Sequence, residues 1–208
     1  QEGGSPPDGS GRPGLNRAQP SSIAFLQFTS GSTGMPKGVI HTHGMICGLV
    51  AGQRALRDID PDNTPVVLDW MPWSHVGAGQ MRLYGMVSQG GTIYLDDGKP
   101  TPAEYKKTLA NLRVVSPTGY AGAPLGWSML GAALESDDAL AARFFSTVTS
   151  LQYGSAAMPI STYERLQALL FQYQGQRKTM STSLMSTEVA LGLSRYWPCE
   201  DQTVVGLP

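Results

Sequence analysis

The stretch Phe28–Val39, which reads FTSGSTGMPKGV, lies between two runs of apolar and β-branched residues. Ile23–Phe28 (IAFLQF) and Val39–His43 (VIHTH) both have the composition of β-strands. The small hydroxyl residues and glycines between them leave many backbone N–H groups accessible, and a loop of this kind binds anions. Lys37 adds a mobile positive charge, and Pro36 restricts the turn that carries it. The stretch therefore predicts an anion-binding loop held by two strands.

Two other interpretations of this loop are weaker. A Walker phosphate loop needs a Gly-Lys-Ser/Thr step with a helix directly after it, whereas here Lys37 follows Pro36 and precedes a strand-like run. A flexible surface linker is the plain alternative, because Ser- and Gly-rich segments are commonly linkers. The closely flanking strands favour the anion-binding interpretation.

Beyond the loop, strand-like and helix-like runs alternate along the chain. Strands are predicted at Pro65–Trp70, Gly91–Asp96, Arg113–Tyr120, Ser150–Gly154 and Lys178–Met185. Helices are predicted at His43–Ile59, Gln80–Ser88, Pro102–Leu112, Pro124–Ser136 and Ser161–Tyr173. This alternation implies an α/β fold with mostly parallel strands.

The stretches that could carry chemistry all follow predicted strands. Besides the loop from Thr29 to Lys37, they are Trp73–His75, the segment at Gly154, and Ser186–Glu188. Ligands of α/β sheets bind beyond the carboxyl ends of the strands. We therefore expect these stretches to share one cleft.

The composition excludes several classes of function. The 208 residues carry a net charge of -1, without the basic stripe typical of nucleic-acid binding. No apolar run approaches the ~20 residues that a membrane helix needs. Cys47 and Cys199 share no metal or redox motif, which is typical of reduced thiols in a cytoplasmic protein, although the sequence leaves a disulfide open.

The two ends of the chain differ from its middle. Gln1–Pro20 is dense in Gly, Pro and Ser, so we expect residues 1–20 to be a disordered linker. The chain starts without Met and stops directly after a strand-like run, and we therefore expect a fragment.

The motifs resemble those of a known superfamily. Phe28–His43 (FTSGSTGMPKGVIHTH) resembles the phosphate-loop signature of the adenylate-forming enzymes, which include acyl-CoA synthetases, luciferases and nonribosomal-peptide adenylation domains. Leu68–Gly79 and Gln89–Pro102 are similar to the feruloyl-CoA synthetase branch, which activates hydroxycinnamic acids. The resemblance covers Ile23–Pro208. It implies a layered αβα fold in which residues 21–208 are part of the large N-terminal AMP-binding domain, with the C-terminal domain absent.

The resemblance assigns the phosphate loop to ATP. The residues that it implies at the ATP phosphates are Thr29, Ser30, Gly31, Ser32, Thr33, Gly34 and Lys37, with Lys37 also catalytic.

Leu184–Ala190 (LMSTEVA) resembles the Gly-x-Thr-Glu motif of the superfamily. In that motif the Thr, here Thr187, contacts a phosphate, and the Glu, here Glu188, helps to hold Mg²⁺. Both are candidate catalytic residues. Met185 replaces the motif's Gly, which could disturb the turn. Alone, Ser-Thr-Glu is also typical of a helix N-terminus.

Two further sites follow from the resemblance. His75 matches the position that borders the acyl pocket near the reacting carboxylate, and it is the fourth candidate catalytic residue. Gly154, Ser155 and Ala156 match the segment that cradles adenine. A buried His bonded to a carbonyl and a plain turn into a helix are the alternatives. His41 and His43 lack the partners of a zinc site.

The implied function is ATP-dependent activation of a carboxylic acid, forming an acyl-adenylate and then a thioester to coenzyme A. The acid is expected to be hydroxycinnamic or a related aromatic acid. A fatty-acyl-CoA or fatty-acyl-AMP ligase is one alternative. A non-catalytic nucleotide-binding module is another, for which Met185 is the main argument. We expect the fragment alone to be inactive, and the sequence leaves the oligomeric state open, a homodimer included.

Overall fold

The computed structural model describes residues 18–29, 35–55, 64–188 and 193–195. The chain divides into two compact units, residues 1–48 and 49–208. The boundary falls inside helix α1 (His43–Ala55). The predicted linker lies outside the described residues up to residue 17, and so do the end of the helix predicted to reach Ile59 and Cys199. Cys47 is an exposed free thiol.

The smaller unit contains a β-hairpin. Strand β1 (Ile23–Thr29) pairs antiparallel with β2 (Lys37–Thr42), in a register that ends at Thr29 opposite Lys37. This confirms the two strands predicted beside the loop, whose residues 30–34 lie outside the described residues. The hairpin is a separate two-stranded sheet. The loop therefore does not follow a strand of the parallel sheet, because β1 and β2 pair with each other across a short connection.

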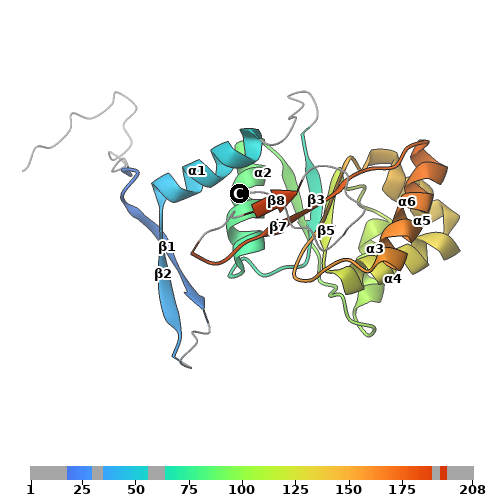
Figure 1. Cartoon of the computed structure of the whole chain (residues 1–208), viewed down its shortest axis with the longest axis horizontal. Helices are drawn as coiled ribbons and strands as arrows, with labels where there is room; N and C mark the ends of the chain where they lie inside the picture. The colour runs from blue at the N-terminus through green and yellow to red at the C-terminus, as the bar shows by residue number, and fades with distance from the viewer. Residues whose placement is uncertain (1–17, 30–34, 56–63, 189–192, 196–208) are drawn as a thin grey trace, which may run out of the picture. The chain divides into compact units, whose positions relative to one another are not determined.

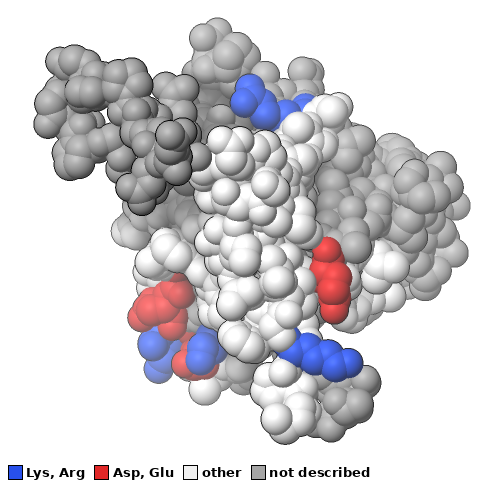
Figure 2. All heavy atoms as spheres, turned by 90° about the vertical axis from the view of Figure 1, so that its left-hand side faces the viewer, with Lys and Arg blue, Asp and Glu red and all other residues white. Residues whose placement is uncertain are grey.

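The hairpin has two unlike faces. On one, His41 is buried and stacks on Phe25 with ring centroids 4.9 Å apart. On the other, Leu26, Phe28 and Ile40 are more than half exposed. Figure 2, which views the molecule from the left-hand side of Figure 1, shows charged side chains in small separate groups among uncharged ones over the described surface.

The larger unit contains the main sheet. Its described strands lie in the order β4-β3-β5-β6-β7-β8. Their bounds are β3 Val66–Asp69, β4 Thr92–Leu95, β5 Gly119–Gly122, β6 Ser150–Tyr153, β7 Met180–Leu184 and β8 Leu193–Arg195. The first five are mutually parallel, and β8 pairs antiparallel with β7 at the edge. The predicted α/β class with mostly parallel strands is confirmed.

Helices connect the parallel strands. They are the π-helix η1 (Val76–Arg82), which continues into α2 (Leu83–Ser88), and α3 (Tyr105–Leu112), α4 (Pro124–Ser136), α5 (Asp138–Thr147) and α6 (Ile160–Gln174). Figure 1 shows α3 to α6 grouped on one side of the sheet and α2 on the other. None of the helices in the described ranges is both long and apolar enough to cross a membrane.

Three elements differ from the sequence predictions. Strand β5 begins at Gly119 rather than Arg113, because the N–H groups of Val114 and Val115 donate to Asn111 O and extend the end of α3. The helix predicted from Gln80 begins earlier, at Val76, as a π-helix. Helix α5, which the sequence analysis does not predict, starts where the Asp137 carboxylate accepts the Leu140 N–H at 2.9 Å.

The core lies between the sheet and α3 to α6. Leu151, Tyr153 and Met180 point from β6 and β7 into a cluster with buried side chains of the helices. Trp127 of α4 is buried there and donates its indole N–H to Gln152 O at 3.0 Å. Side chains alternate between the faces of a strand. The opposite face of the sheet therefore carries the intervening residues, which in β6 and β7 are polar.

Leu170→Ala should destabilise the larger unit by about 2–5 kcal/mol, because the side chain is fully buried in α6 and its loss leaves a cavity. The neighbouring Phe171 is 63% exposed, so Phe171→Ala is the control and should change the free energy of unfolding by less than about 0.5 kcal/mol. Urea unfolding of both variants measures the difference. Equal effects would contradict the assignment of the core.

Asp137 should make stability depend on pH in the acid range. The Leu140 N–H and then the Arg113 guanidinium hold the pKa of Asp137 below its usual value. Its stabilisation is therefore complete above the unfolded pKa of about 3.9 and is lost as pH falls through the lower folded value. We expect wild type to exceed Asp137→Asn in stability at pH 6 and to lose that advantage by about pH 2. A constant difference, measured by urea unfolding at both pH values, would contradict this.

Candidate functional site

The strand order reverses at the centre of the parallel sheet. From β3 the chain passes through η1 and α2 to β4 on one side, and then through α3 to β5 on the other side of β3. Such a reversal opens a crevice at the carboxyl ends of the two strands that part, here β3 and β5, and ligands of α/β proteins bind in such crevices.

A pocket of about 1180 Å³ lies in the larger unit at this crevice. Its lining includes residues that follow β3, β5 and β6, namely Trp70, Ala123 and Gly154. It also includes residues that precede the same strands, namely Pro65, Thr118 and Thr149. At roughly 3.3 Å per residue, Thr149 to Ser155 spans on the order of 20 Å. The pocket therefore extends along the length of β3, β5 and β6 on one face of the sheet.

Asp69 ties together the two segments that frame the pocket beside β3. One carboxylate oxygen accepts the Met71 N–H at 3.0 Å, and the other pairs with Arg82 Nε at 2.9 Å. Both side chains are largely buried, with 7% of Asp69 and 14% of Arg82 exposed. Arg82, at the end of η1, also lines the pocket. The ion pair thus holds η1 against the turn that follows β3.

His75 is the N-cap of η1 and lines the pocket. Its Nδ1 accepts the Gly77 N–H at 3.0 Å, and its carbonyl accepts the Gly79 N–H at 2.8 Å. A neutral imidazole that accepts at Nδ1 carries its proton on Nε2. His75 is therefore arranged to donate a hydrogen bond from Nε2, rather than being a buried histidine.

Ser155 adopts a backbone conformation that side chains rarely take. Its φ is 71°, and among the described residues it is the only non-glycine residue with positive φ. Ser155 is exposed and lines the pocket directly after β6, between Gly154 and Ala156. Backbone strain of this kind concentrates at ligand-binding sites.

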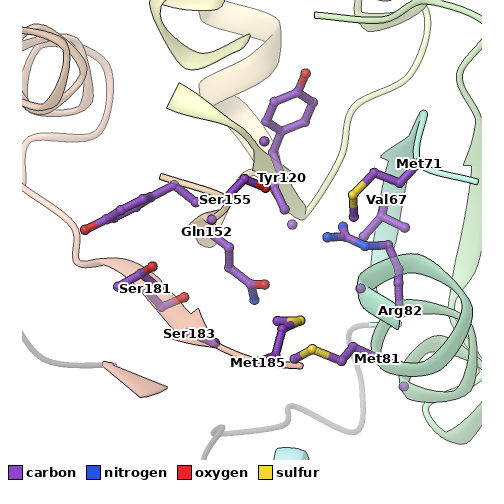
Figure 3. Close-up of a pocket in the computed structure, with 18 of the residues that line it drawn as sticks. Val67, Met71, Met81, Arg82, Tyr120, Gln152, Ser155, Ser181, Ser183 and Met185 are labelled. Carbon is purple, nitrogen blue, oxygen red and sulfur yellow. The ribbon is translucent and has the colours of Figure 1, made fainter. Parts of the chain in front are cut away.

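The predicted stretch that begins at Ser186 follows β7 and reaches the pocket. Met185 and Thr187 line it and are half-buried, and Glu188 is exposed beside them. Met185 has no positive φ, so the side chain that replaces the motif's Gly is accommodated without backbone strain. Figure 3 shows Met185 beside Met81, both at the pocket.

The structure thus gathers part of the predicted site. His75, Gly154, Ser155, Ala156 and Thr187 line one pocket. Thr29 and Lys37 face each other in the hairpin of the smaller unit. The predicted residues Ser30, Gly31, Ser32, Thr33 and Gly34 lie outside the described residues.

A metal ion in this pocket would need oxygen atoms of a bound nucleotide in addition to protein side chains. In the described ranges, no group of three or more His, Cys, Asp or Glu side chains could hold a metal ion. Mg²⁺ in nucleotide sites is commonly bound by one or two carboxylates together with phosphate oxygens. Glu188 does not line the pocket, but it is exposed and directly follows the lining residue Thr187, so its carboxylate is the candidate for that arrangement.

Sequence reasoning missed the ion pair of Asp69 and Arg82 and the pocket position of Gln152. Asp69 falls within a predicted strand, and Arg82 within a predicted helix. A buried acidic residue at the end of a strand was the available signal, because buried carboxylates are almost always paired.

Comparisons with known proteins show the family of the chain. The family model described as AMP-binding enzyme matches residues 2–208. A carboxylic acid reductase of Mycobacterium tuberculosis is 33% identical over 116 residues, which are 55% of this chain and 9% of that protein. A long-chain-fatty-acid–CoA ligase of Gallus gallus is 30% identical over 127 residues, 60% of this chain and 16% of that protein. The chain thus spans less than a fifth of these relatives.

Solved structures share the fold at lower identity. The adenylation and carrier domains of McyG, complexed with phenylalanyl-adenylate, match 94% of this chain and 35% of theirs with a TM-score of 0.72 and 22% identity. A malonyl-CoA ligase with methylmalonyl-CoA and AMP bound matches 99% of this chain and 38% of its own, with a TM-score of 0.67 and 22% identity.

Gly79→Ala should disrupt the pocket wall, because a Cβ at this position would overlap the Trp73 carbonyl oxygen. We expect a loss of about 2–3 kcal/mol in the free energy of unfolding. Gly154→Ala is the control, since no atom lies within 4 Å of the added carbon and φ is not positive there. A thermal unfolding scan of both variants tests this. A stable Gly79→Ala protein would show that η1 does not require the close approach.

Proposed function

The chain belongs to the family of AMP-binding enzymes, and we propose that it forms the nucleotide-binding part of an enzyme that activates a carboxylic acid with ATP. In the first step a carboxylate oxygen attacks the α-phosphorus of ATP, which gives an acyl-adenylate and releases pyrophosphate. In the second step the thiol of coenzyme A attacks the acyl carbon, which gives a thioester and releases AMP. The observation that carries the proposal is the single pocket shared by His75, Gly154–Ala156 and Thr187.

The nucleotide would lie at the carboxyl ends of β6 and β7. The exposed backbone at Gly154 and Ser155 offers a surface for adenine. The Thr187 hydroxyl would donate to a phosphate oxygen, and the Glu188 carboxylate would hold Mg²⁺. When bound, Mg²⁺ neutralises charge on the triphosphate. These roles use the residues that follow adjacent parallel strands.

The hairpin would bind the β- and γ-phosphates. Its loop carries small residues and backbone N–H groups, and Lys37 supplies a positive charge at the start of β2. Preorganised donors of this kind stabilise charge that develops on a leaving pyrophosphate.

His75 would act on the acid. Its Nε2–H would donate to a carboxylate or carbonyl oxygen of the substrate and orient it for attack on the α-phosphorus. No covalent intermediate with a protein side chain is needed in this sequence of steps.

The acid that we propose is hydroxycinnamic or a related aromatic acid, on the motif similarity of Leu68–Gly79 and Gln89–Pro102. A fatty-acyl-CoA or fatty-acyl-AMP ligase is the second candidate. The similarity to the Gallus gallus protein, which is named as a long-chain-fatty-acid–CoA ligase, favours this second candidate. The length of the pocket, on the order of 20 Å, would also suit a long chain.

Exchange of labelled pyrophosphate into ATP tests the first step in the protein as its gene encodes it. We expect exchange to depend on an added acid, with ferulate and hexadecanoate compared in parallel. Glu188→Gln should lower the exchange rate by about 100-fold, because it weakens charge stabilisation at the triphosphate, and should raise the Mg²⁺ concentration required.

Glu104→Gln is the matched control for this experiment. Glu104 precedes α3 and does not line the pocket, so the exchange rate of the Glu104→Gln variant should stay within about twofold of that of wild type. Acid-dependent exchange that is equally fast in Glu188→Gln would remove Glu188 from the mechanism. A folded protein without exchange for any acid would contradict the proposed function.

A further inference from the structure

We propose that Arg82 and Gln152 select the acid by hydrogen-bonding an uncharged polar group on the part of the acid that is remote from its carboxyl. The group would be a hydroxyl, methoxy or keto oxygen. This inference rests on the proposed function, because it assigns the substrate class of the same pocket. It follows from the polarity of the sheet face, the ion pair at Arg82 and the absence of a second permanent charge among the described lining residues.

The side chains on the sheet face that lines the pocket are small or polar. Its residues alternate with the core residues of the same strands: Gly119 and Ala121 in β5, Ser150 and Gln152 in β6, and Ser181 and Ser183 in β7. Parallel strands are ordinarily apolar on both faces. Here the polar positions coincide with the pocket, so this face binds a ligand with polar atoms.

Arg82 and Gln152 approach the pocket from its two walls. Figure 3 shows the Arg82 guanidinium extending from η1 and the Gln152 carboxamide extending from β6 into the same space. The Gln152 carboxamide donates to Ser150 Oγ at a long 3.5 Å. Arg82 contacts Asp69 through Nε, and its guanidinium lies at the pocket beside this ion pair. A ligand oxygen between the walls could accept from both side chains.

Asp69 determines which charge the remote group of the bound acid can carry. Its carboxylate, 2.9 Å from Arg82 Nε, compensates the guanidinium charge. Among the described lining residues, no other Arg, Lys, Asp or Glu is present. A second carboxylate on the ligand would meet the negative charge of Asp69 beside Arg82. An uncharged acceptor avoids that repulsion and still takes a charge-assisted hydrogen bond.

A saturated hydrocarbon chain would fit this face poorly. It would remove the Gln152 carboxamide and the Arg82 guanidinium from water without offering an acceptor to either, and lost hydration that no new hydrogen bond replaces is costly. The methionines at positions 71, 81 and 185, which Figure 3 shows around Arg82, can adapt to the shape of the remaining apolar part of a ligand.

Two matched pairs of acids test the inference. One pair is 4-hydroxycinnamate and cinnamate, and the other is 16-hydroxyhexadecanoate and hexadecanoate, so each pair differs by one remote hydroxyl. Calorimetric binding and pyrophosphate exchange are measured on the protein as its gene encodes it. In at least one pair the hydroxylated acid should bind about tenfold to 100-fold more tightly than its partner.

Variants assign this preference to residues. Arg82→Met and Gln152→Met should each bring the binding ratio of the preferred pair close to one by weakening the hydroxylated acid. Arg82→Met leaves Asp69 unpaired and could unfold the protein, so Gln152→Met, which breaks no ion pair, is the second and independent variant. Arg177→Met, in an exposed pair with Glu164, is the control and should keep the wild-type ratio.

The outcomes separate the inference from the proposed function. A binding preference that Gln152→Met abolishes supports the inference, even if no acid gives exchange, and in that case the proposed function alone is overturned. Exchange with binding ratios near one in both pairs, or ratios that every folded variant retains, overturns the inference alone. A folded protein that binds none of the four acids overturns both.

Discussion

The packing of Leu151, Tyr153 and Met180 against α3 to α6 is the interaction on which the larger unit depends. It holds β6 and β7 side by side and in register, because Leu151 lies opposite Met180 in the parallel ladder. The residues that follow the two strands, at Gly154 and Thr187, are thereby brought to one edge. The candidate site is therefore a consequence of where the apolar face of the sheet is covered.

A second constraint acts within the pocket wall. Asp69 binds the turn after β3 through one oxygen and Arg82 through the other. Without this carboxylate, η1 would have no ionic link to the strand that precedes it. Asp69, at the end of β3, thus positions Arg82 and fixes the turn at Met71. Because both side chains are largely buried, the loss of either partner would leave the other charge buried without compensation and would destabilise the fold.

The chain shows which features sequence patterns can predict. Strands β3, β4 and β6 and helices α4 and α6 lie close to their predicted bounds, because their apolar spacing is local and regular. His75, Gly154 and Thr187 were predicted to share a cleft, since each follows a strand, and they do. The pairing of Arg82 with Asp69 could not be predicted, because it depends on the π-helical register of η1. Strand β5 was predicted six residues too early, since Val114 and Val115 have strand propensity but extend the end of α3.

The alternation of side chains in β6 and β7 also bears on how such a protein can diverge. Tyr153 and Met180 face the helices, whereas Gln152 and Ser181 face the pocket. Replacements on the pocket side leave the packed side intact, so residues such as Gln152 can be exchanged at less cost in folding than residues of the core. Selection for a new ligand and selection for a stable chain then act on different positions of the same strands. A sheet with one face packed as the core and the other lining a pocket is in this sense a scaffold that tolerates drift where recognition occurs.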